Sequence, residues 1–175
     1  ESTKSNAGVE FVPKFLKVKG LLEAAVNGDL PAMKKIVEGG TGMLSRMTGK
    51  DTNRVDLNCS DVRGMTALMY AATFTSKTVV DFLISKKDEV VVNALDNTQK
   101  SALHHGCKRA KSRRASQFDS QQSEIIELLL NNGACLEGRD HNGCTALMFA
   151  VANGDEAVTV TLLKASANVN VQDFE

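Results

Sequence analysis

Two adjacent histidines, His104 and His105, are the first residues whose chemistry would suggest a catalytic or metal-binding site. Consecutive side chains on a helix point about 100° apart, so these two rings cannot readily hold one metal ion. The four cysteines form no CxxC pair, and no histidine lies at zinc-finger spacing from two of them, so we expect reduced cysteines. The sequence also lacks a phosphate-binding loop and a G-x-S-x-G motif. We therefore expect a protein that is not an enzyme and that uses neither a metal nor a cofactor.

A basic stretch, CKRAKSRRASQFDSQQSE, offers a different kind of chemistry. Within it, Arg113 and Arg114 precede Ser116 at positions minus three and minus two, which resembles the recognition sequence of basophilic protein kinases. Phosphate there would add about −1.5 to −2 charge next to several cations. Alternatively, the stretch is a solvated basic loop that no kinase modifies, or a continued helix whose cations face water. The string KRAK also resembles a nuclear-import patch.

The overall composition limits the class of protein. The chain has 175 residues, of which 42% are hydrophobic and 24% are charged, as is typical of a globular domain. Lys plus Arg and Asp plus Glu both total 21, so a strongly basic nucleic-acid binder is disfavoured. No run approaches the roughly 18 apolar residues that a membrane span requires, and the first residues, ESTKSNAGVEF, contain no apolar stretch of the kind that a secretory signal has. We expect a cytoplasmic location, with the nucleus as an alternative.

The elements that must position these residues recur along the chain. The string GMTALMYAA at 64–72 returns as QKSALHHGC at 99–107 and as GCTALMFAV at 143–151. The aspartates before these strings are Asp61, Asp96 and Asp140, at separations of 35 and 44, and Asp173 follows 33 residues later. A period near 33 residues with insertions is typical of a solenoid repeat.

Each repeated unit predicts a turn followed by two helices. Glycine in the D-x-x-G-x-T string favours a tight turn, and Thr66, Ser101 and Thr145 are suited to cap the helix that follows. ANGD at 152–155 then ends one helix and begins the next. The second helix carries apolar residues at helical spacing, which we expect to face the core: Ile125, Leu128, Leu129, Val158, Leu162 and Leu163.

The strings RGMTALMYAA, LLLNNGACLEGRD and NGCTALMFAVANGD closely resemble the ankyrin repeat, over about residues 20–173. The resemblance implies an all-α solenoid of stacked helix-turn-helix ankyrin repeats with β-hairpin-like tips. The family's usual histidine is present as His104, where we expect a structural role, hydrogen-bonding the neighbouring hairpin. Met69 and Met148 replace it in the other units, which predicts weaker hydrogen bonding between hairpin and helix. The family's proline after the threonine is alanine throughout.

The predicted organisation is an N-terminal extension at 1–16 and an ankyrin-repeat domain at 17–175. The domain has about four repeats, and a fifth is truncated at the C-terminus, which suggests that the natural protein continues. The first repeat is degenerate and is followed by an extension at 41–56. The third carries an insertion at 108–122, which we expect to be the most mobile internal segment.

Solenoids act through an extended concave face, so the candidate site is a surface rather than a cleft. Alignment of the units predicts one residue of each first helix along that face, with further residues beside them and at the hairpin tips. The predicted row is Glu23, Tyr70, His105 and Phe149; beside it lie Phe74, Lys108, Arg109 and Asn153, and at the tips Arg63, Asn97 and His141. The alternative is that Tyr70 and Phe149 merely fill gaps between helices.

The resemblance implies a protein–protein interaction module, part of a larger scaffold or regulatory protein, that binds a partner protein through its concave face. An alternative is a regulatory domain of a larger enzyme, controlled by phosphorylation at Ser116 through a basophilic kinase. Nucleic-acid binding through the basic stretch is a third possibility. The zero net charge and the absence of aromatic residues within the basic run count against it.

Overall fold

The computed structural model describes residues 14–38, 55–74, 76–86, 88–108 and 119–174. These residues form four pairs of helices, each pair joined by a short turn or loop except the third. The pairs are α1 (Lys14–Asn27) with α2 (Leu30–Glu38), α4 (Ala67–Thr73) with α5 (Lys77–Ser85), α6 (Ala102–Cys107) with α7 (Asp119–Asn131), and α8 (Ala146–Asn153) with α9 (Glu156–Lys164).

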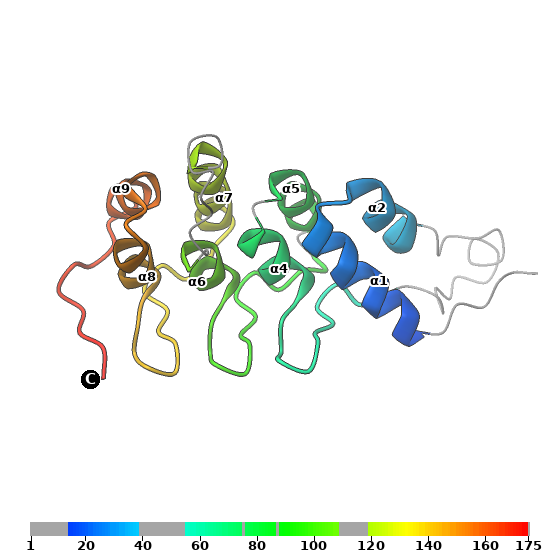
Figure 1. The fold of residues 1–175 in the computed structure, drawn as a ribbon, viewed down its shortest axis with the longest axis horizontal. Coiled ribbons are helices and arrows are strands. Elements are labelled where there is room, and N and C mark those ends of the chain that lie inside the picture. The colour runs from blue at the N-terminus through cyan, green and yellow to red at the C-terminus, as the bar shows by residue number, and fades with distance from the viewer. Residues whose placement is uncertain (1–13, 39–54, 75, 87, 109–118, 175) are drawn as a thin grey trace, which may run out of the picture.

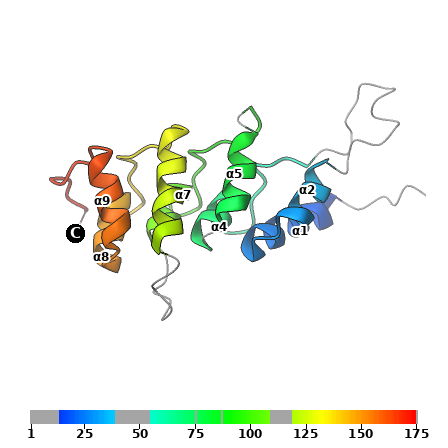
Figure 2. The ribbon, with the colours of Figure 1, turned by 90° about the horizontal axis from the view of Figure 1, so that it is seen from above.

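The pairs stack side by side in chain order (Figure 1). The first helices of the pairs, α1, α4, α6 and α8, form an inner row that adjoins the hairpin loops, and the second helices form an outer row. Figure 2 shows the same order from above. Within the described residues the only β pairing is an isolated bridge between Ser60 and Thr66. The prediction of an all-α ankyrin-type solenoid is therefore confirmed.

Neighbouring hairpin tips are joined by a repeated backbone hydrogen bond. The residue after each hairpin aspartate donates its N–H to a carbonyl of the preceding hairpin at 3.0 Å. The donors are Asn97, His141 and Phe174, and their acceptors are the carbonyls of Arg63, Thr98 and Asn142, respectively. Because the tips are linked in this way, all of them project to the same side of the stack (Figure 1).

The inner helices α4, α6 and α8 begin directly after the residues that the sequence predicts as N-caps. Thr66, Ser101 and Thr145 occupy the N-cap positions of α4, α6 and α8 in extended backbone conformation. The Thr66 hydroxyl accepts the N–H of Met69 at 3.4 Å. Asp155 caps α9 by accepting the N–H of Val158 at 3.1 Å. Satisfying these free N–H groups helps to fix where α4 and α9 begin.

His104 links two repeats, as expected. Its Nδ1 accepts the Ser101 N–H at 3.2 Å, so its Nε2 carries the proton and donates to the Gly138 carbonyl of the next repeat at 3.0 Å. In the other units the sulfur of Met69 or Met148 accepts the corresponding cap N–H at 3.4 Å. A thioether has no second polar atom, so these units lack the bond to the next repeat.

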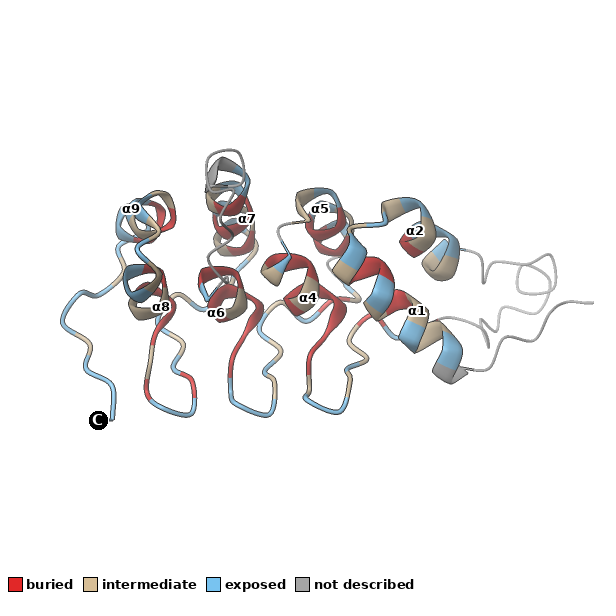
Figure 3. Cartoon of the chain, viewed as in Figure 1, coloured by how far each residue is buried: buried red, intermediate tan, exposed pale blue. Residues whose placement is uncertain are grey.

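Buried residues occur in both rows of helices and in the hairpin segments that lead into α4, α6 and α8 (Figure 3). Leu68, Ala71 and Ala72 are buried in α4, as predicted. On the outer row, Ile125, Leu129, Val158 and Leu162 are also buried. Two expectations were wrong: Leu163 is 43% exposed and Leu128 is only partly buried, whereas Ile126 is fully buried.

Two predicted boundaries also differ from the structure. Helix α1 begins at Lys14, inside the stretch expected to be an extension. Helix α7 begins at Asp119, and Gln122 within it is fully buried rather than part of a mobile insertion. The Gln122 amide donates to the carbonyl of Gly106 at 2.7 Å and to that of Ala72 at 3.3 Å, so it joins the ends of α4 and α6.

The first hairpin provides a test of how closely successive tips must approach. A Cβ atom on Gly64 would lie 2.9 Å from the backbone nitrogen of Asn97, whereas Gly133 has nothing within 4 Å, and both have positive φ. We expect Gly133→Ala to lower the unfolding free energy by about 1 kcal/mol through backbone strain alone. Gly64→Ala should cost about 2 kcal/mol because it adds a clash with backbone. Urea unfolding followed by circular dichroism measures both, and equal losses would contradict the close approach.

Candidate partner-binding surface

Each described hairpin is organised by the aspartate that begins it. In Asp61, Asp96 and Asp140 alike, Oδ1 accepts the backbone N–H groups of the second and fourth residues that follow, at 2.7–2.9 Å. An aspartate side chain can hold a turn in this way because it mimics a backbone acceptor. The recurring aspartate in the sequence therefore marks a rigid tip.

The other carboxylate oxygen of each aspartate holds a larger side chain. Each Oδ2 lies 2.7–2.8 Å from a polar atom of one larger side chain, and Asp61 Oδ2 also accepts from Arg63 Nε at 3.3 Å. The pairs are Asp61 with the Tyr70 hydroxyl, Asp96 with the His105 Nε2–H, and Asp140 with the Lys100 ammonium. These contacts fix the positions of Tyr70 and His105, two members of the predicted row.

The hydrogen bonds also set the ionisation of these carboxyls. Burial alone would raise the pKa of Asp61, Asp96 and Asp140, but the donated hydrogen bonds outweigh it and hold each pKa below its ordinary value. Burial lowers the pKa of His105, and the hydrogen bond to Asp96 only partly opposes this. At neutral pH the three aspartates are therefore ionised and His105 is neutral.

The second repeat presents an exposed aromatic stack. The Arg63 Nη2 donates to the Tyr70 hydroxyl at 2.5 Å, and the guanidinium lies 5.9 Å from the centre of the Tyr70 ring. Phe74 stacks near the same ring, with the Tyr70 and Phe74 ring centres 6.4 Å apart and their planes inclined by 15°. Phe74 is 54% exposed. An arginine and two aromatic rings are thus presented together on α4 and its hairpin.

A second aromatic cluster lies in the fourth repeat. The Phe149 ring on α8 meets the edge of His104, with ring centres 6.1 Å apart. The ammonium groups of Lys100 and Lys108 lie 5.6 and 5.8 Å from its centre, within the range of cation–π attraction. Phe149 therefore packs on α6 while part of its surface remains accessible.

The remaining predicted site residues belong to neither aromatic cluster. Glu23 is exposed on α1 and lies 3.7 Å from Lys19. Asn97 and Asn153 hold the fold, because their side-chain amides donate to the carbonyls of Val62 and Cys107 at 3.0 and 2.6 Å. His141 is an exposed tip residue. Arg109 and Ser116 lie outside the described residues.

Lys100 is the residue that sequence reasoning missed. Its side chain is only 9% exposed, and its ammonium lies between Asp140 and Phe149. Lysine is almost never buried unless it is paired, so the residue type alone predicts that the Lys100 side chain is exposed to solvent. The feature of the sequence that could have indicated a place in the hairpin is that Lys100 lies four residues after the recurring aspartate Asp96.

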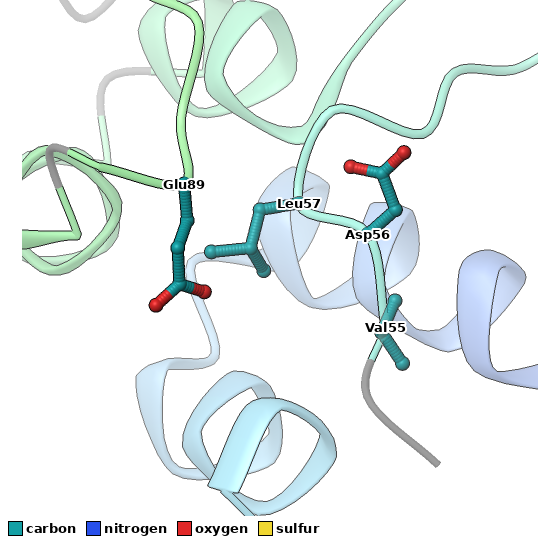
Figure 4. Close-up of a pocket in the computed structure, with 4 residues that line it drawn as sticks. All are labelled: Val55, Asp56, Leu57 and Glu89. Carbon is teal, nitrogen blue, oxygen red and sulfur yellow. The ribbon is translucent and has the colours of Figure 1, made fainter. Parts of the chain in front are cut away.

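A cavity of about 320 Å³ near the first repeat is lined by Val55, Asp56, Leu57 and Glu89. Figure 4 shows Leu57 pointing toward Glu89, whereas the Asp56 carboxylate points the other way. The two carboxylates therefore do not converge. In the part of the chain that the structure describes, no three His, Cys, Asp or Glu residues are grouped to hold a metal ion. No described helix is both long and apolar enough to cross a membrane.

Comparison with known proteins agrees with this architecture. A family model described as ankyrin repeats in three copies matches residues 21–118 and 114–173. The chain is also 29% identical over 101 residues to the transient receptor potential cation channel subfamily A member 1 of Drosophila melanogaster. That match covers 58% of this chain but only 7% of the channel subunit, so the chain spans a small part of this relative. The recurring hairpins, the four helical pairs and the family match together show that the chain belongs to the ankyrin-repeat family.

Proposed function

We propose that this domain binds another protein through its inner-helix face, with Tyr70 and Phe149 as anchors. The inner-helix face is the surface of α4, α6, α8 and their hairpins that carries Arg63, Tyr70, Phe74, His105, Lys108 and Phe149. Ankyrin repeats are protein-interaction modules, and the family match brings that general role to this chain. Which face is used, and by which residues, is our proposal.

The single observation that carries the proposal is the stack of Arg63, Tyr70 and Phe74 with its exposed outer ring. Aromatic residues and arginine are enriched among the residues that dominate binding energy. Tyr70 is fixed in advance by its hydrogen bond to Asp61, so binding would cost little side-chain entropy. The alternative role, in which aromatic residues only fill gaps between helices, explains the buried parts of Tyr70 and Phe149. It does not explain why Phe74 is 54% exposed.

The test uses peptides selected from a random display library by the wild-type domain. We expect Tyr70→Ala and Phe149→Ala each to weaken the binding of these peptides by about 2 kcal/mol, roughly thirtyfold. Tyr70→Phe is the matched control, because it keeps the ring and should keep most of the affinity. Val160→Ala, at an exposed position on the outer helix α9, should change nothing. If selected peptides bind both alanine variants as well as the wild type, the partner uses another surface.

Regulation by phosphorylation is a second proposal, in which this domain belongs to a larger enzyme and Ser116 is modified by a basophilic kinase. It is supported by the two arginines before that serine. Lys108, eight residues before that serine in the sequence, caps the end of α6 beside Phe149 of the inner-helix face.

A further inference from the structure

We propose that the segment bound by the inner-helix face is acidic: a stretch of a partner protein that carries aspartate or glutamate at both ends of its contact. This inference rests on the proposed function and names the partner's chemistry. It follows from how the face separates its positive and negative charges, although the chain as a whole has equal numbers of both.

The carboxylates of the face are turned inward. The side chains of Asp96 and Asp140 are 6% and 0% exposed, and that of Asp61 is 21% exposed. Arg63, which pairs with Asp61, is 68% exposed. The three carboxylates therefore bind groups within the hairpins, whereas the Arg63 guanidinium remains in contact with solvent.

The inner helices themselves add no negative charge in repeats two to four. The sequences of α4, α6 and α8, ALMYAAT, ALHHGC and ALMFAVAN, contain no aspartate or glutamate. His105 is neutral at neutral pH because burial lowers its pKa. The exposed acid that we find on the inner row is Glu23 on α1, where Lys19 lies 3.7 Å away. The exposed charged groups of the inner-helix face in repeats two to four are therefore Arg63 and Lys108, which are both positive.

Each cation lies beside an aromatic ring. Arg63 lies over Tyr70, and exposed Lys108 lies 5.8 Å from the centre of Phe149. Among the described residues, the Lys108 ammonium forms no ion pair. A partner carboxylate at each position would gain an ion pair, while neighbouring apolar atoms pack on the ring.

The distance between the two clusters sets the length of the segment. Their rings, Tyr70 on α4 and Phe149 on α8, lie two repeats apart, and packed helices are about 8–10 Å apart. An extended chain advances about 3.3–3.6 Å per residue, so about five or six residues span the clusters. The structure therefore favours a segment that covers both rings with about five or six residues and carries an acidic residue near each cluster.

A single-stranded nucleic acid also combines negative charge with groups that stack on aromatic rings. Its affinity depends on many phosphate contacts along a basic groove. The inner-helix face offers few exposed cations, and three ionised aspartates lie directly beneath it. An acidic protein segment, which needs only two ion pairs, fits this arrangement better.

The experiment selects random peptides in parallel on the wild-type domain and on the Tyr70→Ala/Phe149→Ala double variant. We expect the peptides enriched only on the wild type to carry net negative charge. One such peptide, labelled with a fluorophore, is then measured by anisotropy at low and high salt. Lys108→Glu should weaken its binding about tenfold or more and reduce the salt dependence. Lys164→Glu, at an exposed position on α9, is the matched control and should have little effect.

The outcomes separate this inference from the proposed function. If enriched peptides need Tyr70 and Phe149 but are neutral or basic, the acidic partner is ruled out and the proposed binding face stands. If no enriched peptide depends on those two residues, the proposed function itself fails. Unchanged affinity in Lys108→Glu overturns the role of that lysine. A single-stranded oligonucleotide that competes with equal affinity overturns the assignment to a protein segment.

Discussion

Leu103→Ala is expected to lower the free energy of unfolding by about 2–5 kcal/mol, because it removes a fully buried side chain from the middle of the stack. Leu103 lies on α6, which packs against α4, α7 and α8. The surrounding residues belong to three different helices and cannot all move in to fill the cavity. Urea unfolding followed by circular dichroism gives the change directly.

Leu163→Ala is the matched control, since it removes the same atoms from a side chain that is 43% exposed on α9. We expect it to cost clearly less than Leu103→Ala. Solenoid stability depends on contacts between neighbouring repeats, so the Leu103 variant should also unfold less cooperatively. Equal losses in the two variants would mean that α6 is not the centre of the core described above.

Much of the fold could be predicted because the sequence repeats its local signals. The N-caps Thr66, Ser101 and Thr145 each follow a recurring aspartate, so both the turn and the start of the inner helix are visible in one string. The orientation of the outer helices was harder to predict. In IIELLL at 125–130 five of the six residues are apolar, so the apolar pattern does not fix the rotation of the helix, and only packing against the inner row selects Ile126 over Leu128.

The candidate site was predictable only in part for a related reason. The hairpin aspartates were recognisable as turn residues through their effect on the local backbone. Their second oxygens reach Tyr70, His105 and Lys100, and the last of these contacts joins two different repeats. Burial of Gln122 likewise depends on two carbonyls, of Ala72 and Gly106, that are distant in sequence. Such partners are set by stacking, which composition and periodicity do not reveal.

Lys100→Met is expected to destabilise the domain by about 3–5 kcal/mol, because it leaves the Asp140 carboxylate buried without its counter-charge. In the wild type the Lys100 ammonium lies 2.8 Å from Asp140 Oδ2, and the two side chains are 9% and 0% exposed. Methionine keeps most of the volume of lysine, so a cavity contributes little. Lys77→Met is the control: Lys77 pairs with Glu124 at the surface, and solvent screens that pair. It should unfold almost as the wild type does.

The pH dependence separates the loss of charge pairing from the loss of packing. In the wild type the pKa of Asp140 lies below its unfolded value, so its stabilising contribution is complete above about pH 5 and is lost as the pH falls through the folded pKa. Without the ammonium, burial raises the pKa of the same carboxyl, and the variant takes up a proton at higher pH. The stability gap between wild type and Lys100→Met should therefore narrow between neutral pH and about pH 4. Adding Asp140→Asn to the variant should recover part of the loss at neutral pH, because the amide is uncharged while its oxygen can still accept the hairpin N–H groups. A gap that stays constant with pH, with no recovery in the double variant, would show that Lys100 acts through its contact with Phe149 and not through its charge.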